Sequence, residues 1–226
     1  MRRLPLLALF FLVWGVLPAD AQYTRQQMRD SLKQAADTLA WHPNNIDLRL
    51  RKASWNMQLE QYDRAKDEYD LILQQQPDNL AALFFRAYAN RQLHRYAFAR
   101  LDYQQLLTII PDHFEARLGL ALLHQEEQHF TQALDQVNIL VQQHPDSAIA
   151  YAARADIECE MKMFSLAEYD YSEAIRLNPH NTDYLINRAD IYIRMRENEK
   201  AYQDLKRLQQ LGVARKALQP LYDRLK

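Results

Sequence analysis

A pattern that repeats every 34 residues constrains the fold of this chain more than any other feature. A fixed period of this length is typical of arrays of helix-turn-helix units, each of which buries its apolar face only against its neighbours. The pattern therefore predicts an all-α fold, an α-solenoid of stacked helix pairs. Its prolines are Pro43, Pro77, Pro111, Pro145 and Pro179. Its two columns of alanine are Ala53, Ala87, Ala121, Ala155 and Ala189, and Ala65, Ala99, Ala133, Ala167 and Ala201.

An aromatic residue between the two alanines completes a recognisable motif. The alanine at repeat position eight, this aromatic residue, the second alanine and the closing proline together resemble the tetratricopeptide repeat. The resemblance covers five units, residues 46–213, and implies a right-handed α-solenoid. The aromatic residues are Tyr62, Tyr96, Phe130 and Phe164. The departures are Asn198 and Val213 in the fifth unit, and Arg49, Leu83, Arg117, Tyr151 and Leu185 at position four, which often holds tryptophan in the family.

The first 21 residues have the pattern of a secretory signal peptide. Arg2 and Arg3 precede an apolar run over residues 4–17, and the small residues Ala19 and Ala21 form a signal-peptidase site. The run is short for a membrane span, so an uncleaved signal-anchor is the lesser alternative. The sequence thus predicts an exported protein, and we expect the bacterial periplasm rather than secretion.

The charge balance and the scarcity of glycine exclude several classes of function. Removing Arg2, Arg3 and Asp20 leaves 26 basic and 28 acidic residues, a formal charge of −2. This balance gives no reason to expect nucleic acid as a partner. Gly119 and Gly212 are the only glycines after residue 21, too few for a glycine-rich phosphate loop. We therefore expect no cofactor and no small-molecule substrate.

Capping residues and prolines predict where each helix begins and ends. Asn45, Asn79, Ser147 and Asn181 are good N-caps, and His113 holds the same place in the third unit. Residues 22–45 are predicted to form an N-terminal capping helix and residues 214–226 a C-terminal one. The first helices are predicted at 46–58, 80–92, 114–127, 148–161 and 182–195, and the second helices at 62–75, 96–109, 130–143, 164–177 and 198–210.

Opposite charges recur together at repeat positions 7 and 23. Because a cation accompanies each acid, we interpret them as structural salt bridges between paired helices rather than as catalytic carboxylates. The third unit lacks both charges. The pairs are Lys52 with Glu68, Arg86 with Asp102, Arg154 with Asp170 and Arg188 with Asp204, against Leu120 with Gln136.

Two histidines and one cysteine remain as candidates for site chemistry. His124 and His129 lie beside Glu126 and Glu127, but their spacing of five differs from the spacing of four that places two metal ligands on one helical face. We interpret them as solvated side chains at a helix end and expect no metal site. Cys159 is interpreted as a small buried hydrophobe, with an intermolecular disulfide as the weaker alternative.

The resemblance implies that the concave side of the first helices holds an extended peptide or a partner helix. Family members that clamp a C-terminal carboxylate carry Lys and Asn where this chain has Leu50 and Ser54, so we expect an apolar ligand segment with some basic residues instead. These groove residues have two other interpretations: they bury the neighbouring first helix, or they form a self-association surface. The candidate groove residues are Leu50, Phe84, Tyr88, Arg91, Leu118, Leu122, Asp156 and Asp190.

Taken together, these patterns predict a non-enzymatic adaptor or scaffold that binds an envelope protein or peptide segment. No arrangement of catalytic residues can be assigned. The alternative is a structural homo-oligomer of the cell envelope, in which another copy of the chain occupies the groove or the C-terminal cap.

Overall fold

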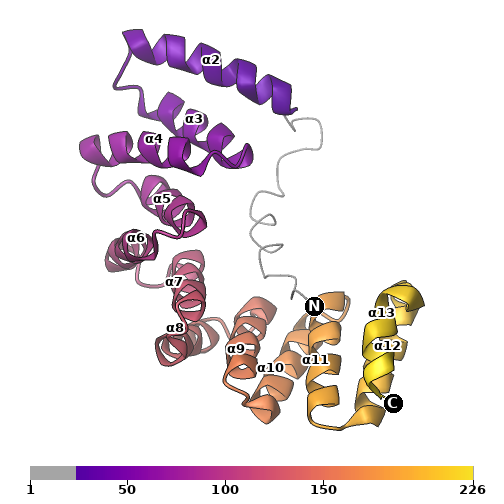
Figure 1. Cartoon of the computed structure of the whole chain (residues 1–226). Helices are drawn as coiled ribbons and strands as arrows, with labels where there is room; N and C mark the ends of the chain where they lie inside the picture. Colours follow the sequence, from indigo (N-terminus) through magenta and orange to yellow (C-terminus); the bar gives the residue numbers. More distant parts are fainter. Residues whose placement is uncertain (1–23, 226) are drawn as a thin grey trace. The chain divides into compact units, whose positions relative to one another are not determined.

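The computed structural model describes residues 24–225, so the predicted signal peptide lies outside the described residues. Within this range, twelve α-helices and one 3-10 helix follow one another along the chain without a strand (Figure 1). The helices are α2 (Arg25–Trp41), α3 (Ile46–Gln58), α4 (Tyr62–Gln75), α5 (Leu80–Gln92), α6 (Tyr96–Ile109), α7 (Phe114–Glu126), α8 (Phe130–Gln143), α9 (Ala148–Glu160), α10 (Phe164–Leu177), α11 (Thr182–Arg194), α12 (Asn198–Gln210), α13 (Arg215–Tyr222) and the 3-10 helix η3 (Asp223–Leu225). None of the helices described is long and apolar enough to cross a membrane.

The first helix of every repeat begins where its capping residue predicts. Asn45 and Asn79 accept hydrogen bonds from backbone N–H groups in the first turns of α3 and α5. Ser147 and Asn181 do the same for α9 and α11. His113 also acts as a cap, because its Nδ1 accepts from the N–H of Ala116 at 3.2 Å. Each cap satisfies at least one of the backbone donors that a helix start leaves without a partner, and Asn181 satisfies two.

Every first helix ends in a turn that contains a residue in the left-handed conformation. The residue after this one donates its backbone N–H to a carbonyl five residues earlier, as in Gln61 to Asn56 at 2.8 Å, which is the hydrogen bond of a Schellman motif. These turns reverse the chain into the second helix. The left-handed residues are Glu60, His94, Gln128, Lys162 and Arg196.

The described residues divide into two compact units, one that ends at Ala116 and one that begins at Arg117. In the first unit α3 pairs with α4 and α5 with α6, while in the second α9 pairs with α10 and α11 with α12. The alanine columns lie where the paired helices meet, and all ten alanines are fully buried. A methyl group at these positions allows the close approach of the helices, so a larger side chain would force them apart.

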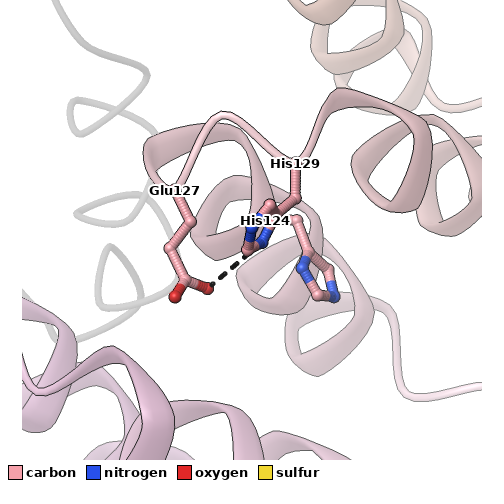
Figure 2. A group of neighbouring side chains, drawn as sticks. All are labelled: His124, Glu127 and His129. Atoms are coloured by element: carbon pink, nitrogen blue, oxygen red, sulfur yellow. Dashed lines mark ion pairs between the residues drawn. The ribbon is translucent and has the colours of Figure 1, made fainter.

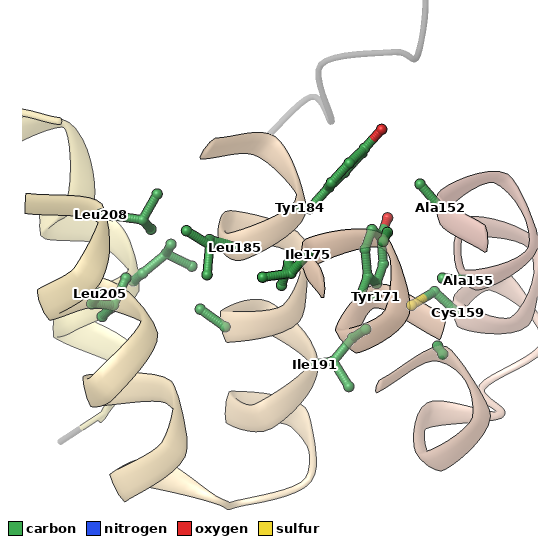
Figure 3. Packing of buried hydrophobic residues seen from close by; sticks show 14 of the residues in the cluster. Ala152, Ala155, Cys159, Tyr171, Ile175, Tyr184, Leu185, Ile191, Leu205 and Leu208 are labelled. Atoms are coloured by element: carbon green, nitrogen blue, oxygen red, sulfur yellow. The ribbon is translucent and has the colours of Figure 1, made fainter. Parts of the chain in front are cut away.

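The core of the second unit extends to its C-terminal helix. Tyr171, Leu185, Leu205 and Leu208 pack between successive helices, as Figure 3 shows. Leu218 and Leu221 of α13, which are also buried, belong to the same cluster. Helix α13 therefore covers apolar surface that the last repeat would otherwise expose to solvent. Cys159 is buried in this cluster, as its first interpretation predicted.

All four predicted salt bridges form. The N–O distances are 2.6 Å for Lys52–Glu68, 2.6 Å for Arg86–Asp102, 2.5 Å for Arg154–Asp170 and 2.7 Å for Arg188–Asp204. In the third repeat, Gln136 accepts a hydrogen bond from Arg117 instead, at 3.2 Å. The acids are thus structural partners of the arginine and lysine side chains on the adjacent helix.

Candidate functional site

In the first unit, three of the predicted groove residues are partly exposed on first helices. Leu50 lies on α3, and Phe84 and Tyr88 lie one turn apart on α5. Because residues four apart occupy the same helical face, Phe84 and Tyr88 present their rings on one side of α5. The sequence pattern thus identified a surface that remains partly open to solvent.

Neighbouring rings hold the two aromatic side chains in place. Phe84 packs edge-on against Phe85 at 5.2 Å between centroids and stacks on His113 at 5.8 Å. Tyr88 contacts Tyr62 edge-on at 6.5 Å. Such contacts fix the ring orientation before any ligand arrives, which lowers the entropy cost of binding. Tyr62 was predicted only as the aromatic residue of the repeat pattern. Its aromatic side chain on the helix before that of Tyr88 was the signal that could have placed it at this surface.

Arg91 differs from this prediction because its side chain is buried. It still acts on the surface electrostatically: partial burial raises the pKa of Tyr88, while the positive charge of Arg91 lowers it. Arg91 is therefore not available to contact a ligand directly, although its charge acts on Tyr88.

The second unit presents less of the predicted groove. Leu118 and Leu122 on α7 are buried, so these two side chains belong to the packed interior rather than to an accessible ligand surface. Their burial agrees with the interpretation that apolar first-helix residues pack against neighbouring elements. Sequence alone does not separate the two roles, because both require the same apolar side chains.

The two predicted acidic residues of the second unit already have partners within the chain. Asp156 accepts a hydrogen bond from the hydroxyl of the buried Tyr171, which also accepts from Asn187 at 2.8 Å. This contact raises the pKa of Tyr171, after the larger effect of its burial.

Asp190 is paired with two arginines. Arg194 lies one turn further along α11, with an N–O distance of 2.7 Å, and Arg224 of η3 lies at 2.5 Å. Arg224 of the C-terminal segment thus places its positive charge beside Asp190, a side chain that the sequence assigned to ligand binding. A basic ligand segment would have to compete with these arginines for Asp190.

His124, Glu127 and His129 come together at the turn between α7 and α8 (Figure 2). The interpretation of both histidines as solvated side chains is wrong for His124, which is only 8% exposed. A spacing of five places two side chains on different faces only within one continuous helix. In the structure, α7 ends at Glu126 and the chain then reverses, so His129 is not part of the helix that carries His124. Sequence reasoning missed this cluster because it applied helical periodicity beyond the end of the helix.

The stacked helix pairs define an α-solenoid of the tetratricopeptide repeat type. No protein-family model and no curated protein matches the sequence. Among solved structures, a tetratricopeptide repeat protein from Parabacteroides merdae is similar, with 23% identity and a TM-score of 0.67, covering 89% of this chain and 78% of that one.

Two further structures share the fold. MamA from Desulfovibrio magneticus RS-1, from residue 41 to its end, is 15% identical with a TM-score of 0.67, covering 75% of this chain and 96% of that one. YrrB, a tetratricopeptide repeat protein with an unusual peptide-binding site, is 14% identical with a TM-score of 0.59, covering 78% and 91% of the two chains. The chain therefore has the fold of tetratricopeptide repeat proteins.

Proposed function

We propose that this chain is an exported, non-enzymatic adaptor that binds a segment of an envelope protein on the first-helix surface of its first unit. The observation that carries the proposal is the pair Phe84 and Tyr88, two partly exposed rings on one face of α5 whose orientation neighbouring rings fix. Aromatic side chains with restricted motion are the residues that contribute most to protein interfaces. The likeness in fold to YrrB, which has a peptide-binding site, is consistent with such a role.

The bound segment is apolar or aromatic in this proposal. Leu50 and the rings of α5 offer carbon surface, whereas the acids Asp156 and Asp190 of the second unit are engaged within the chain. Attraction to basic residues of a ligand is therefore a minor contribution. The main gain comes from removing apolar surface from water, about 25 cal/mol per Å².

Crosslinking in the native envelope tests this function directly. Wild-type protein is compared with a Phe84→Ala, Tyr88→Ala double variant, and crosslinked peptides are identified by mass spectrometry. We expect one envelope protein to crosslink to α3 and α5 of the wild type and to be lost from the variant. Retention of the same partner by the variant would contradict the proposed surface.

The matched control lies on the second helix of the same repeat. Phe98 and Leu101 on α6 are both strongly exposed, so a Phe98→Ala, Leu101→Ala double variant removes similar apolar surface without touching α5. We expect this control to keep the partner.

Fractionation of cells tests export separately, because the proposal requires the protein in the envelope or periplasmic fraction.

Self-association is the second candidate function, and exposed apolar residues on second helices favour it. Phe98 and Leu101 on α6 occupy the same repeat positions as Leu166 and Tyr169 on α10, and all four are exposed. Size-exclusion chromatography with light scattering separates the two candidates. A dimer that persists at low concentration and is abolished by Phe98→Ala, Leu101→Ala would favour the homo-oligomer over the adaptor.

A further inference from the structure

We infer that His124, Glu127 and His129 form a binding site for a divalent transition-metal ion, with Zn²⁺ as the expected occupant. Each of the three residues offers one ligand atom, and these atoms all lie within 4.8 Å of one another. The carboxylate of Glu127 lies 3.9 Å from Nδ1 of His129, and the two imidazole centroids are 6.2 Å apart. Figure 2 shows the three side chains converging on one side of the turn.

The turn geometry explains why a spacing of five suits this site. The N–H of His129 donates to the carbonyl of His124 at 2.8 Å, and Gln128 between them has a φ of 61°. This is the Schellman motif, in which the residue after the left-handed position returns to the residue five earlier, and side chains at these two positions often touch. The backbone thus brings the two histidines together without any metal.

The other four repeats show that the three ligands are a specific departure of the third. All five turns share the same hydrogen bond, yet the third repeat alone has ligating side chains at all three places. The residues equivalent to His124 are Asn56, Asn90, Glu158 and Tyr192. Those equivalent to Glu127 are Leu59, Leu93, Met161 and Met195, and those equivalent to His129 are Gln61, Arg95, Met163 and Glu197.

Glu127 is the most informative of the three substitutions. Its column is apolar in every other repeat, and its side chain is only 18% exposed. A carboxylate at this place adds a charged oxygen ligand beside the two imidazoles, which no other repeat has in this column.

The donor set and its exposure fit a Zn²⁺ ion with one open position. Two histidines and a carboxylate are three ligands of the kind that Zn²⁺ uses, and a water completes the tetrahedron. Tetrahedral coordination at about 2.1 Å requires ligand atoms roughly 3.4 Å apart. The ligand atoms here lie up to 4.8 Å apart, so they must approach one another by up to about 1.4 Å. His129 is 49% exposed, which leaves the site open to an ion from solvent.

Zinc titration of the purified protein, free of any polyhistidine tag, tests the site. Isothermal calorimetry with ZnCl₂ should show one ion bound per chain. The variants His124→Asn, Glu127→Leu and His129→Arg should each weaken binding at least tenfold. Each variant carries a residue that another repeat of this chain has at the same place, so the turn should still fold, and circular dichroism checks that it does.

Two control variants exclude other ligands. His113→Asn removes a remote histidine at a column where three repeats have asparagine, and Cys159→Ala removes the thiol. Both should bind Zn²⁺ as the wild type does. Co²⁺ provides a second measurement, since the visible absorption of a four-coordinate site should disappear in the His124→Asn variant.

Two results would overturn the inference. One is the absence of saturable binding with Zn²⁺ at about 100 μM, which would mean that the cluster is only a set of packed side chains. The other is binding that all three ligand variants retain, or that the Cys159→Ala variant loses, which would place the ion elsewhere in the chain.

Discussion

Glu158 is a carboxyl group that the fold holds away from water, with only 6% of its surface exposed. Burial, followed by the negative charge of Asp170, raises the pKa of Glu158 from 4.5 to about 7 against the opposing effect of Arg154. The folded protein therefore keeps a proton that the unfolded chain releases above pH 4.5. The stability linked to this proton is fully present below pH 4.5 and is lost as the pH rises through 7.

A Glu158→Gln substitution should remove this pH dependence, because an amide does not ionise. Between pH 4.5 and pH 8, the free energy of unfolding of the variant should rise relative to wild type by on the order of 2 kcal/mol. Urea denaturation at the two pH values measures the difference. Glu160→Gln, an exposed site on the same helix, controls for the loss of one acidic side chain. Parallel pH profiles for Glu158→Gln and wild type would contradict this account.

The ion pair of Arg154 with Asp170 contributes through the cost of breaking it. Asp170 is almost fully buried and accepts from Nε and Nη2 of Arg154 at 2.5 and 2.8 Å. Asp170→Ala would leave the guanidinium without its main counter-charge and should destabilise the fold by about 3 kcal/mol. An Arg154→Leu, Asp170→Gln double variant copies the uncharged pair of the third repeat and should cost clearly less. Denaturation of the two variants checks this order, and a double variant as unstable as the single one would refute it.

The turns between paired helices carry a local strain that glycine would relieve. Lys162 adopts a φ of 61°, a conformation that costs a residue with a Cβ roughly 1–2 kcal/mol. Lys162→Gly should therefore stabilise the protein by about 0.5–1 kcal/mol, once the greater entropy of glycine in the unfolded chain is included. Thermal unfolding measures the gain. Lys162→Ala keeps a Cβ and should show none, so an equal gain in both variants would rule out backbone strain as the cause.

Helix positions were predictable because local residues determine them. A proline and a capping side chain such as Asn45 act within one turn of the chain, and all five repeats carry equivalent signals. The salt bridges were predictable for a related reason, since the charges at positions 7 and 23 appear and vanish together. Such periodic signals indicate which helix faces meet.

The candidate site was less predictable because it depends on how deeply each side chain is covered. Arg91 and Leu122 are residue types expected at a ligand surface, yet both side chains are buried. Likewise, the approach of His124 to His129 depends on a left-handed turn at Gln128, and no glycine marks that turn in the sequence. Exposure and turn conformation are set by packing, which residue periodicity does not report.

The last repeat of the chain depends on its C-terminal cap. Leu218 and Leu221 bury their side chains in the same cluster as Leu205 and Leu208 of α12. Polar contacts add to this packing: Asn198 donates to the carbonyl of Leu225 at 3.3 Å. In a solenoid each unit contacts only its neighbours, so an uncovered terminal face loses stability first at that end.

Truncation after Val213 should therefore unfold the second unit from its C-terminal end. Burial of two leucine side chains accounts for about 3–6 kcal/mol, at 1.5–3 kcal/mol each, and their removal also exposes Leu205 and Leu208. Amide hydrogen exchange should show protection lost in α11 and α12 before α9 and α10. Arg224→Ala is the matched control: it breaks only the exposed pair with Asp190 and should cost less than about 1 kcal/mol. If truncation left the exchange of α12 unchanged, or if Arg224→Ala were equally damaging, the stabilising role of α13 would have to be assigned to that ion pair or abandoned.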